Sequence, residues 1–435
     1  MADYKAMYQQ KLGTAAEAAQ LVESGWVIGS DAGSAQPDGF LMAVSARAQA
    51  GELEGVKVHT MLDSYPYPFY ADESLFGKIM GVSWFSSGGA RKAVNGGFGD
   101  LIPAYYRDMP KAIRANYDYD AYVVSVSPMD SHGYFSLATT SSFSEAMIDK
   151  AARIIVEVND QQPRALCNTQ IHVSRVTAIV ENSHPLPVLK PPVIDDVSRR
   201  IGELIAEQIP DGACIQLGIG AIPDATGMAL KTKKDLGIHT EMFTDSMVEL
   251  LECGAVNNSK KQIHRGKTVT TFAFGSQRIY DFINDNPCME ILPVDYVNDP
   301  NVICQNDNMI SINAALEVDL FGQVCAESVG TKHMSGTGGQ VDYVRGACQS
   351  KGGKSFIAFA STAKGGTISK IKSILTPGAI VTTSKNDVDY IVTEYGMAHL
   401  RGESLGSRAR QLIAIAHPDF RDELTFEAKK RGMLI

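Results

Sequence analysis

Short apolar runs alternate with amphipathic stretches along most of the chain. Residues 14–25 have a helical pattern that begins with the capping pair Thr14 and Glu17 and ends at Gly25. An apolar run at 26–30 then leads into a glycine-rich turn and a second helical stretch. Further β-branched apolar runs occupy residues 56–62, 121–127 and 153–159. Because strands that are covered on both faces are almost continuously apolar, the pattern predicts an α/β fold with largely parallel sheets and flanking helices.

A proline-rich segment interrupts this pattern. Four of the ten residues at 183–192 are proline, which cannot continue a helix or lie in a central strand. We therefore predict a linker at 186–192 between an N-terminal domain of residues 1–185 and a C-terminal domain of residues 193–435.

The second half of the chain begins as the first half does. A helical pattern at 195–209 is followed, within 210–230, by a strand, a glycine loop and a helix. Gly33, Pro37 and Asp38 of the first half have counterparts in the second half at Gly220, Pro223 and Asp224. This order predicts an internal duplication of two related α/β domains.

Composition and charge exclude several classes of partner. The net charge is -9 and no basic stripe occurs, so a nucleic-acid partner is not expected. No apolar run reaches the roughly 20 residues that a membrane-spanning helix needs, so we expect no membrane partner. The seven cysteines are scattered without zinc-like spacing, which predicts reduced thiols, no metal and a cytoplasmic location. A small molecule is the expected partner.

Two glycine-rich segments are candidate ligand loops. In residues 216–224 the glycines Gly218 and Gly220 precede a helix start, where free backbone amides suit a phosphate or a thioester oxygen. Pro223 stands where a dinucleotide fingerprint needs its third glycine, which disfavours a nicotinamide site. The second segment, 334–347, contains Gly336, Gly338 and Gly339. For both segments a turn without a ligand is the competing interpretation.

Glu241, Glu327 and Glu394 lie in or beside strand-like runs. The carboxylate of a glutamate in such a position is usually solvated or paired. Glu241 differs because it follows the first glycine loop by roughly 20 residues, the length of a helix and a return to the next strand. That spacing would bring its carboxylate beside loop amides that can stabilise an oxyanion. His239 would share its face of the strand, either as a substrate contact or as a core residue.

Several long segments, among them 217–225, 236–245, 312–324, 335–347 and 368–402, closely resemble the acetyl-CoA hydrolase/transferase family of class I CoA-transferases. The likeness is strongest to its 4-hydroxybutyrate and butyryl-CoA:acetate CoA-transferase members. It covers nearly the whole chain, although residues 63–85 depart from the pattern of the 4-hydroxybutyrate enzymes.

The resemblance implies two related CoA-transferase domains and a nucleophile, Glu241, which passes through a glutamyl-CoA thioester. It also implies coenzyme A as a substrate, no tightly bound cofactor, and a homo-oligomer. Short-chain acyl-CoA (acetyl, butyryl or 4-hydroxybutyryl) and a carboxylate such as acetate are the implied substrates. The residues implied to contact CoA are Gly218, Ile219, Gly220, Ala221, Ile222, Leu316, Gly339 and Lys364.

Three alternatives stay open from the sequence. An acyl-CoA hydrolase on the same scaffold would share every motif named above. A CoA-binding protein without turnover is disfavoured because Glu241 is retained in its motif. A nicotinamide-dependent dehydrogenase is disfavoured by the incomplete fingerprint at Pro223.

Overall fold

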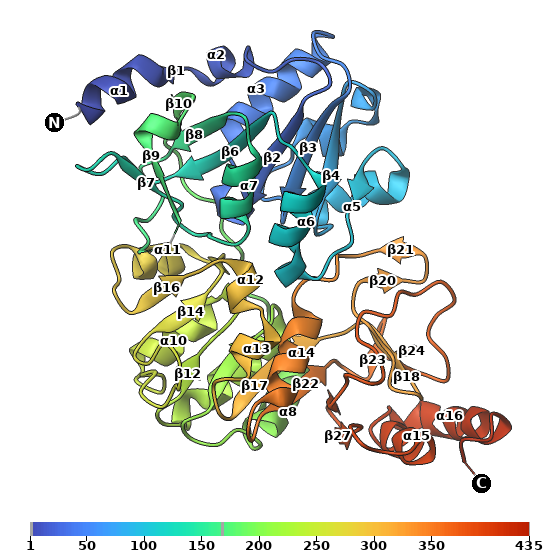
Figure 1. Cartoon of the computed structure of the whole chain (residues 1–435). Coiled ribbons are helices and arrows are strands. Elements are labelled where there is room, and N and C mark those ends of the chain that lie inside the picture. The colour runs from blue at the N-terminus through green and yellow to red at the C-terminus, as the bar shows by residue number, and fades with distance from the viewer. Residues whose placement is uncertain (1–2, 167–168, 435) are drawn as a thin grey trace. The chain divides into compact units, whose positions relative to one another are not determined.

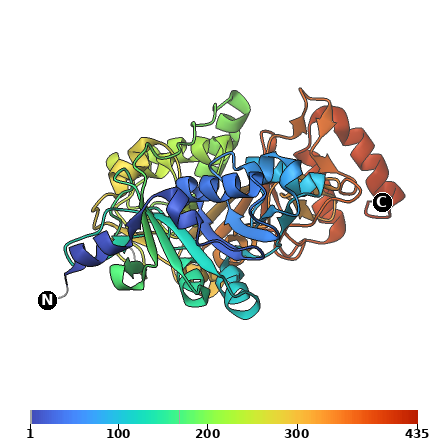
Figure 2. The same cartoon turned by 90° about the horizontal axis from the view of Figure 1, so that it is seen from above.

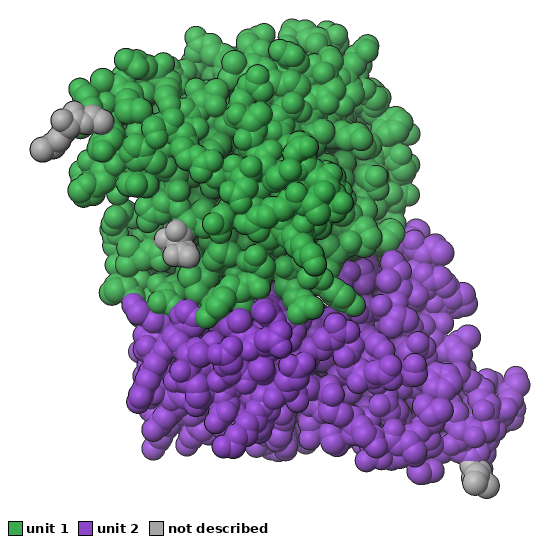
Figure 3. Space-filling view, viewed as in Figure 1, with its two compact units in different colours: residues 1–190, 269–297, 333–336 green, residues 191–268, 298–332, 337–435 purple. Residues whose placement is uncertain are grey.

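The computed structural model describes residues 3–166 and 169–434 of the chain. Its contacts divide the protein into two compact units (Figure 3). Unit 1 contains residues 1–190, 269–297 and 333–336, and unit 2 contains residues 191–268, 298–332 and 337–435. The chain first passes between the units after Lys190, within the proline-rich segment. The domain boundaries expected from the sequence stay a prediction, since the units are defined by contacts in space.

Unit 1 is built on an eight-stranded parallel sheet (Figure 1). In spatial order its strands are β1 (Leu12–Gly13), β10 (Ala178–Glu181), β8 (Ile154–Val158), β6 (Ala121–Val126), β2 (Val27–Ala32), β3 (Val56–Met61), β4 (Ile79–Ser83) and β5 (Asp100–Leu101). The apolar runs predicted as strands around residues 56–62, 121–127 and 153–159 form β3, β6 and β8.

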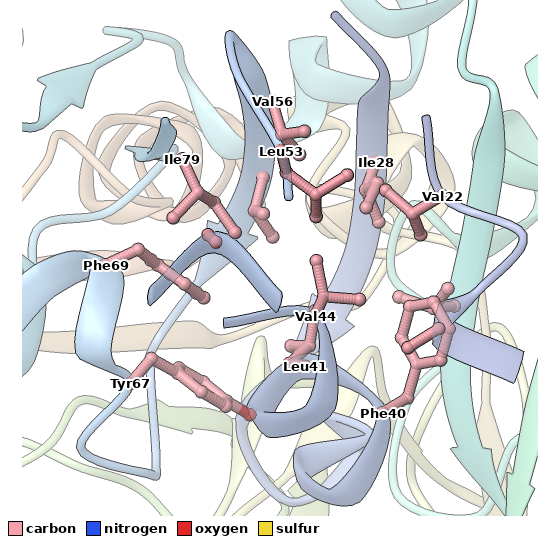
Figure 4. Packing of buried hydrophobic residues seen from close by; sticks show 14 of the residues in the cluster. Val22, Ile28, Phe40, Leu41, Val44, Leu53, Val56, Tyr67, Phe69 and Ile79 are labelled. Atoms are coloured by element: carbon pink, nitrogen blue, oxygen red, sulfur yellow. The ribbon is translucent and has the colours of Figure 1, made fainter. Parts of the chain in front are cut away.

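Helices cover both faces of this sheet. The helices of unit 1 are α1 (Tyr4–Lys11), α2 (Ala15–Ala19), α3 (Asp38–Gln49), α4 (Pro68–Ala71), α5 (Gly88–Gly96), α6 (Met109–Asn116), α7 (Ser144–Lys150), α11 (Gln277–Ile283) and α12 (Val294–Val297). Ile28 of β2 packs in the apolar cluster with Leu41 and Val44 of α3 (Figure 4). The next residue, Gly29, faces the opposite side, where a Cβ atom would lie 2.7 Å from Sδ of Met147 in α7. The two helices therefore cover opposite faces.

A buried carboxylate ties together several elements of unit 1. Asp31, at the end of β2, is fully buried. It accepts hydrogen bonds from the hydroxyls of Tyr122 (2.6 Å), Thr140 (3.2 Å) and Ser144 (2.5 Å) and from the amide of Ala32 (2.8 Å). These donors lie on β6, on the segment before α7, on α7 and on β2, so one side chain satisfies four buried donors.

Unit 2 contains a six-stranded sheet with its own helices. In spatial order the strands are β12 (Gly237–Ile238), β11 (Cys214–Leu217), β17 (Met309–Ala314), β22 (Lys354–Ala358), β26 (Tyr390–Thr393) and β27 (Gly396–His399). All neighbours are parallel except β26 and β27. The helices are α8 (Asp196–Ala206), α9 (Ala221–Ala229), α10 (Asp245–Glu252), α13 (Pro300–Ile303), α14 (Gln340–Gln349), α15 (Leu405–Ala414) and α16 (Pro418–Lys430).

The C-terminal helices complete the core of unit 2. Leu412 of α15 and Leu424 of α16 pack in one apolar cluster with Ile357 of β22 and Ile391 of β26. The two helices lie side by side in both views (Figures 1 and 2). Pro418 begins α16, where its missing N–H costs no helical hydrogen bond.

Shorter strands complete the two units. They are β7 (Tyr134–Ser136), β9 (Gln170–His172), β13 (Met242–Phe243), β14 (Thr268–Thr270), β15 (Phe272–Ala273), β16 (Met289–Ile291), β18 (Glu317–Asp319), β19 (Val324–Cys325), β20 (Ser328–Val329), β21 (Lys332–His333), β23 (Thr362–Ala363), β24 (Ile368–Ser369) and β25 (Ile371–Lys372).

The two sheets share one topology. The order β3-β2-β6-β8-β10 in unit 1 matches the order β12-β11-β17-β22-β26 in unit 2, and each strand follows in the same sequence along the chain. In each unit, the strand of this set that comes first along the chain, β2 or β11, is followed by a glycine-rich turn and a helix, α3 or α9. The predicted α/β fold with two related parallel sheets is confirmed.

No helix in the described part of the chain is long and apolar enough to cross a membrane. The six described cysteines are all free thiols, and Cys167 lies outside the described residues.

The buried Asp31 yields a stability prediction. Asp31→Ala leaves the hydroxyls of Tyr122 and Ser144 and the amide of Ala32 without an acceptor, so we expect the free energy of unfolding to fall by about 3 kcal/mol or more. Asp118→Ala is the matched control, because the side chain of Asp118 is 91% exposed and pairs only with Lys150 among the described residues. That control should change stability by less than about 1 kcal/mol. Thermal unfolding of both variants measures the difference, and equal midpoints would contradict the role of Asp31.

Candidate functional site

The site lies at the carboxyl ends of the central strands of unit 2. Strand β11 pairs with β12 on one side and with β17 on the other. The strands that follow β11 along the chain therefore lie on both sides of it. In open parallel sheets such a reversal of strand order opens a crevice beyond the carboxyl ends. The predicted glycine loop and Glu241 both follow strands at this edge of the sheet.

The glycine loop begins directly after β11. The amide of Gly218 donates to the carbonyl of Ile312 in β17 (2.8 Å), and a Cβ atom at Gly218 would lie 3.1 Å from that oxygen. Gly220 has φ +125°, a conformation that side chains disfavour. It caps α9, and no side chain accepts from the first turn of that helix in the described structure. The loop thus presents backbone amides beyond the carboxyl end of β11.

At the outer edge of β12, two side chains make hydrogen bonds that a neighbouring strand would otherwise make. The amide of Ile238 donates to Oδ1 of Asn258 (2.9 Å), and the carbonyl of Ile238 accepts from Nζ of the buried Lys261 (2.8 Å). On the inner side, the amide of His239 donates to Ile215 (3.2 Å). Both edges of the strand are therefore fixed just before Glu241.

The carboxylate of Glu241 lies between Asn298 and Gly339. Nδ2 of Asn298 donates to Oε2 of Glu241 (2.7 Å), and the amide of Gly339 also donates to this carboxylate. A Cβ atom at Gly339 would overlap Oε2 of Glu241 and Nδ2 of Asn298. Only glycine therefore allows the backbone to approach the carboxylate this closely.

Gly339 is also the N-cap of α14, a ten-residue helix. The positive end of the helix dipole therefore points at the carboxylate of Glu241 and favours its ionised form. Burial has the larger, opposite effect and raises the pKa of Glu241 to about 7, although the hydrogen bonds from Asn298 and Gly339 lower it. Its pKa therefore lies well above the ordinary value of a glutamate, and shifted pKa values of this kind are common at functional sites.

The other residues predicted to contact CoA are distributed along the same sheet edge. Ile219 is 56% exposed, and Ala221 and Ile222 are half-buried in the first turn of α9. Leu316 is half-buried two residues after β17, and Nε2 of Gln340, at the start of α14, donates to Ala314 of β17 (2.7 Å).

Lys364 stands apart from these residues. It is exposed at the turn between β23 and β24, with φ +50°. No contact in the described structure joins its side chain to Glu241 or to the glycine loop.

The other two candidate carboxylates, Glu327 and Glu394, accept hydrogen bonds from hydroxyl groups. Glu327 accepts from Oγ1 of Thr382 (2.8 Å) and from Oγ1 of Thr337 (3.4 Å). Glu394 accepts from the amide (2.9 Å) and the hydroxyl (2.6 Å) of Ser361. His239 is fully buried, with its ring 6.5 Å from that of Tyr343, as expected of a core histidine.

Two residues of the site were missed by the sequence analysis. Asn298 follows Glu241 by 57 positions and Lys261 follows it by 20, and no motif or periodicity connects either residue to the glutamate. The local signal at 298–300, Asn-Asp-Pro, predicts only a turn or a helix start. Their roles became visible only through distances in the folded chain.

One group of side chains in unit 1 has ligand-like spacing. Asp38, Glu157 and His184 each place one oxygen or nitrogen atom within 4.8 Å of the others. Glu157 accepts from the amides of Gly39 (3.2 Å) and Phe40 (2.8 Å) in α3, and Asp38 Oδ1 lies 2.8 Å from His184 Nε2. Protein contacts thus account for the cluster, and the absence of a metal stays a prediction.

Comparisons with known proteins agree with this geometry. The N-terminal domain of the acetyl-CoA hydrolase/transferase family matches residues 1–190, and the C-terminal domain of that family matches residues 275–428. Among solved structures, RipA from Yersinia pestis superposes with a TM-score of 0.95 at 39% identity, with full coverage of both chains. A 4-hydroxybutyrate CoA-transferase from Porphyromonas gingivalis gives a TM-score of 0.84 at 38% identity, covering 99% of this chain and 100% of the other.

Curated relatives are similar over comparable lengths. A succinyl-CoA:cyclohexane-1-carboxylate CoA transferase of Geobacter metallireducens is 49% identical over 99% of this chain and 98% of its own length. A 4-hydroxybutyrate coenzyme A transferase of Clostridium kluyveri is 51% identical over 80% of this chain and 81% of its own length. With both domain models matched and such relatives spanning its length, the chain belongs to the acetyl-CoA hydrolase/transferase family.

Proposed function

We propose that the protein is an acyl-CoA:carboxylate CoA-transferase that works through a glutamyl-CoA thioester on Glu241. The observation that carries the proposal is the position of this carboxylate, which is fixed by Asn298 and faces the amide of Gly339 at the start of α14. The names of the relatives support the reaction class, since they are CoA-transferases of several short carboxylic acids.

In the first step, a carboxylate oxygen of Glu241 attacks the carbonyl carbon of the acyl-CoA thioester. The C–S bond breaks, CoA leaves as a thiolate, and the acyl group stays on Glu241 as a mixed anhydride. The negative charge that develops on the carbonyl oxygen needs nearby donors, and the N-terminal amides of α14 and the amides of the glycine loop are the candidates.

In the second step, the CoA thiolate attacks the glutamyl carbonyl carbon of the anhydride. This step releases the donor acid as a carboxylate and leaves CoA bound to Glu241 as a thioester. The acceptor carboxylate then attacks the thioester and regenerates a mixed anhydride, and the thiolate finally takes the acceptor acyl group. All four steps are acyl transfers, so the thioester energy is conserved without an external oxidant or energy source.

CoA is proposed to contact the loop Gly218 to Ile222, Leu316 and Gly339, which lie at one edge of the sheet. Lys364 is proposed as a further contact because an exposed ammonium group suits a phosphate of CoA. Butyryl-CoA, acetyl-CoA or 4-hydroxybutyryl-CoA as donor, acetate as acceptor, the absence of a tightly bound cofactor and a homo-oligomeric state also stay predictions.

Trapping the intermediate tests the proposed function directly. After incubation with butyryl-CoA, borohydride should reduce the thioester on Glu241 to an alcohol, which peptide mass spectrometry locates. Glu241→Gln should show no reduced residue and should lose transfer to acetate by at least about a thousandfold. Glu327→Gln serves as the matched control and should keep the modification at Glu241. Butyryl-CoA consumption that does not depend on acetate would identify a hydrolase instead.

The pKa of Glu241 predicts how activity depends on pH. The attacking form is the carboxylate, so kcat/KM should fall as the pH drops below about 7. Asn298→Leu removes a donor that favours the carboxylate, so the acid limb of the profile should move to higher pH. Asn257→Ala removes an exposed amide that bonds Asp235 and should leave the profile unchanged. A limb that stays in place in Asn298→Leu would contradict the assigned contact.

Gly339→Ala tests the close approach of the backbone to the carboxylate. The added methyl group would overlap Oε2 of Glu241, so the carboxylate must move away from the amide. We expect kcat to fall by about a hundredfold or more, as for the loss of an oxyanion donor. The thermal unfolding midpoint checks that the variant is folded. A folded variant with normal kcat would show that this contact is not needed for transfer.

A further inference from the structure

Three side chains of unit 1 come together near the carboxyl ends of its strands. Asp38 is the first residue of α3, Glu157 lies near the end of β8, and His184 follows β10. One oxygen of each acid and one ring nitrogen of His184 all lie within 4.8 Å of one another. The three residues belong to unit 1, so the cluster is complete within one compact unit.

Glu157 is held in the interior by three hydrogen-bond donors. It is 1% exposed and accepts from the amides of Gly39 (3.2 Å) and Phe40 (2.8 Å). A third bond comes from Nδ2 of Asn182 (2.8 Å). Burial raises the pKa of Glu157 above its usual range, and the neighbouring Asp38 adds to the shift, although these hydrogen bonds lower it. Two acids thus share a site of low polarity, where a cation offsets their repulsion.

The imidazole of His184 turns a lone pair toward the acids. Nδ1 of His184 lies 3.0 Å from the carbonyl oxygen of Pro185, and because a carbonyl can only accept, Nδ1 carries the proton. The neutral ring then has an unprotonated Nε2, which lies 2.8 Å from Oδ1 of Asp38. A histidine that binds a metal usually has its other ring nitrogen fixed in this way by a carbonyl.

The approach of Asp38 to His184 is not a hydrogen bond. Oδ1 of Asp38 is buried and has no hydrogen-bond partner among the residues that the structure describes, although Nε2 of His184 lies 2.8 Å away. Protein contacts explain where each side chain lies, but they leave these two acceptor atoms facing each other. Neighbouring ligand atoms that each bind one Zn²⁺ at about 2.1 Å lie roughly 3 Å apart. The observed separation is close to that spacing.

A buried tyrosine hydroxyl near the acids also lacks a partner. Tyr67 is fully buried, and its hydroxyl makes no hydrogen bond within residues 3–166 and 169–434. Burial raises the pKa of Tyr67 well above its ordinary value, and the carboxylates of Asp63, Asp38 and Glu157 add to this shift. Figure 4 shows the side chain of Tyr67 pointing toward α3, the helix that begins at Asp38. A water bound to an ion in the cluster gives this hydroxyl a partner.

We propose that Asp38, Glu157 and His184 bind a divalent metal ion, with Zn²⁺ as the ion that fits best. Imidazole and carboxylate groups are both zinc ligands, and three protein ligands leave a fourth position for water. Mg²⁺ and Ca²⁺ prefer oxygen ligands alone, so the imidazole disfavours them. The prediction of no metal rests on scattered cysteines and does not bear on a site without a cysteine.

The role of the ion is structural. It joins the start of α3 to β8 and to the segment after β10, which are distant from one another along the chain. It also neutralises two carboxylates that repel each other in the interior. Because the unfolded chain does not bring these ligands together, binding of the ion stabilises the folded protein. The inference does not depend on the proposed function.

Titration of the metal-free, full-length protein with Zn²⁺ tests the inference. We expect calorimetry to detect about one Zn²⁺ per chain that depends on this cluster, and no comparable binding of Mg²⁺. Excess Zn²⁺ should raise the thermal unfolding midpoint by about 3 °C or more, and EDTA should reverse the rise.

His184→Gln and Asp38→Asn are the decisive variants, and His172→Gln is their matched control. His172 is a half-buried histidine of the same unit, but its Nδ1 bonds the hydroxyl of Ser174 (2.8 Å) and its ring packs against two tyrosines. We expect each decisive variant to weaken Zn²⁺ binding by about a hundredfold or more, and the control to leave it within about twofold. Unfolding midpoints measured without metal show whether the variants fold.

Co²⁺ distinguishes the cluster from the free thiols. Thiolate ligands give bound Co²⁺ an intense near-ultraviolet absorption that nitrogen and oxygen ligands do not give. A Co²⁺ spectrum without that absorption, which disappears in His184→Gln, supports the site. The inference is overturned if the wild type binds no Zn²⁺, if both decisive variants bind it as tightly as His172→Gln does, if Mg²⁺ binds more tightly, or if the spectrum shows thiolate ligands.

Discussion

The contact between the carboxylate of Glu241 and the backbone of Gly339 constrains the rest of unit 2. The carboxylate must be close enough to accept from this amide, and no side chain can lie between them. Two segments 98 residues apart must therefore be placed with little tolerance. The sheet provides that accuracy, because β11, β12 and β17 carry the connected loops at one edge. The side chain of Gln340, at the start of α14, donates a hydrogen bond to Ala314, the last residue of β17.

The same contact explains the balance of charge at the site. Removal from water would keep Glu241 protonated, while the helix start, Asn298 and the Gly339 amide favour its ionised form. The result is a carboxyl group whose pKa lies near neutrality instead of near its ordinary value. Lys261 stabilises the strand before Glu241 by donating to the carbonyl of Ile238.

The two units share a topology but have different residues at equivalent positions. At the end of β2, Asp31 is buried and satisfied by four donors, which makes it a structural residue. At the end of β11, the chain has no such acid, and the glycine loop leads into the start of α9 without a side-chain cap in the described structure. Related folds therefore need not carry related sites.

The sequence by itself determined the α/β class, the parallel strands, the repeated unit and the special place of Glu241. These follow from hydrophobic period, glycine and proline positions, and a spacing of one helix between loop and carboxylate, all of which are local properties. Gly339 was one of three glycines in a candidate ligand loop, but its contact with Glu241 was not predicted. The roles of Asn298 and Lys261 were decided only by tertiary structure. Their hydrogen bonds join residues that are distant in sequence, and no local pattern records such a pairing.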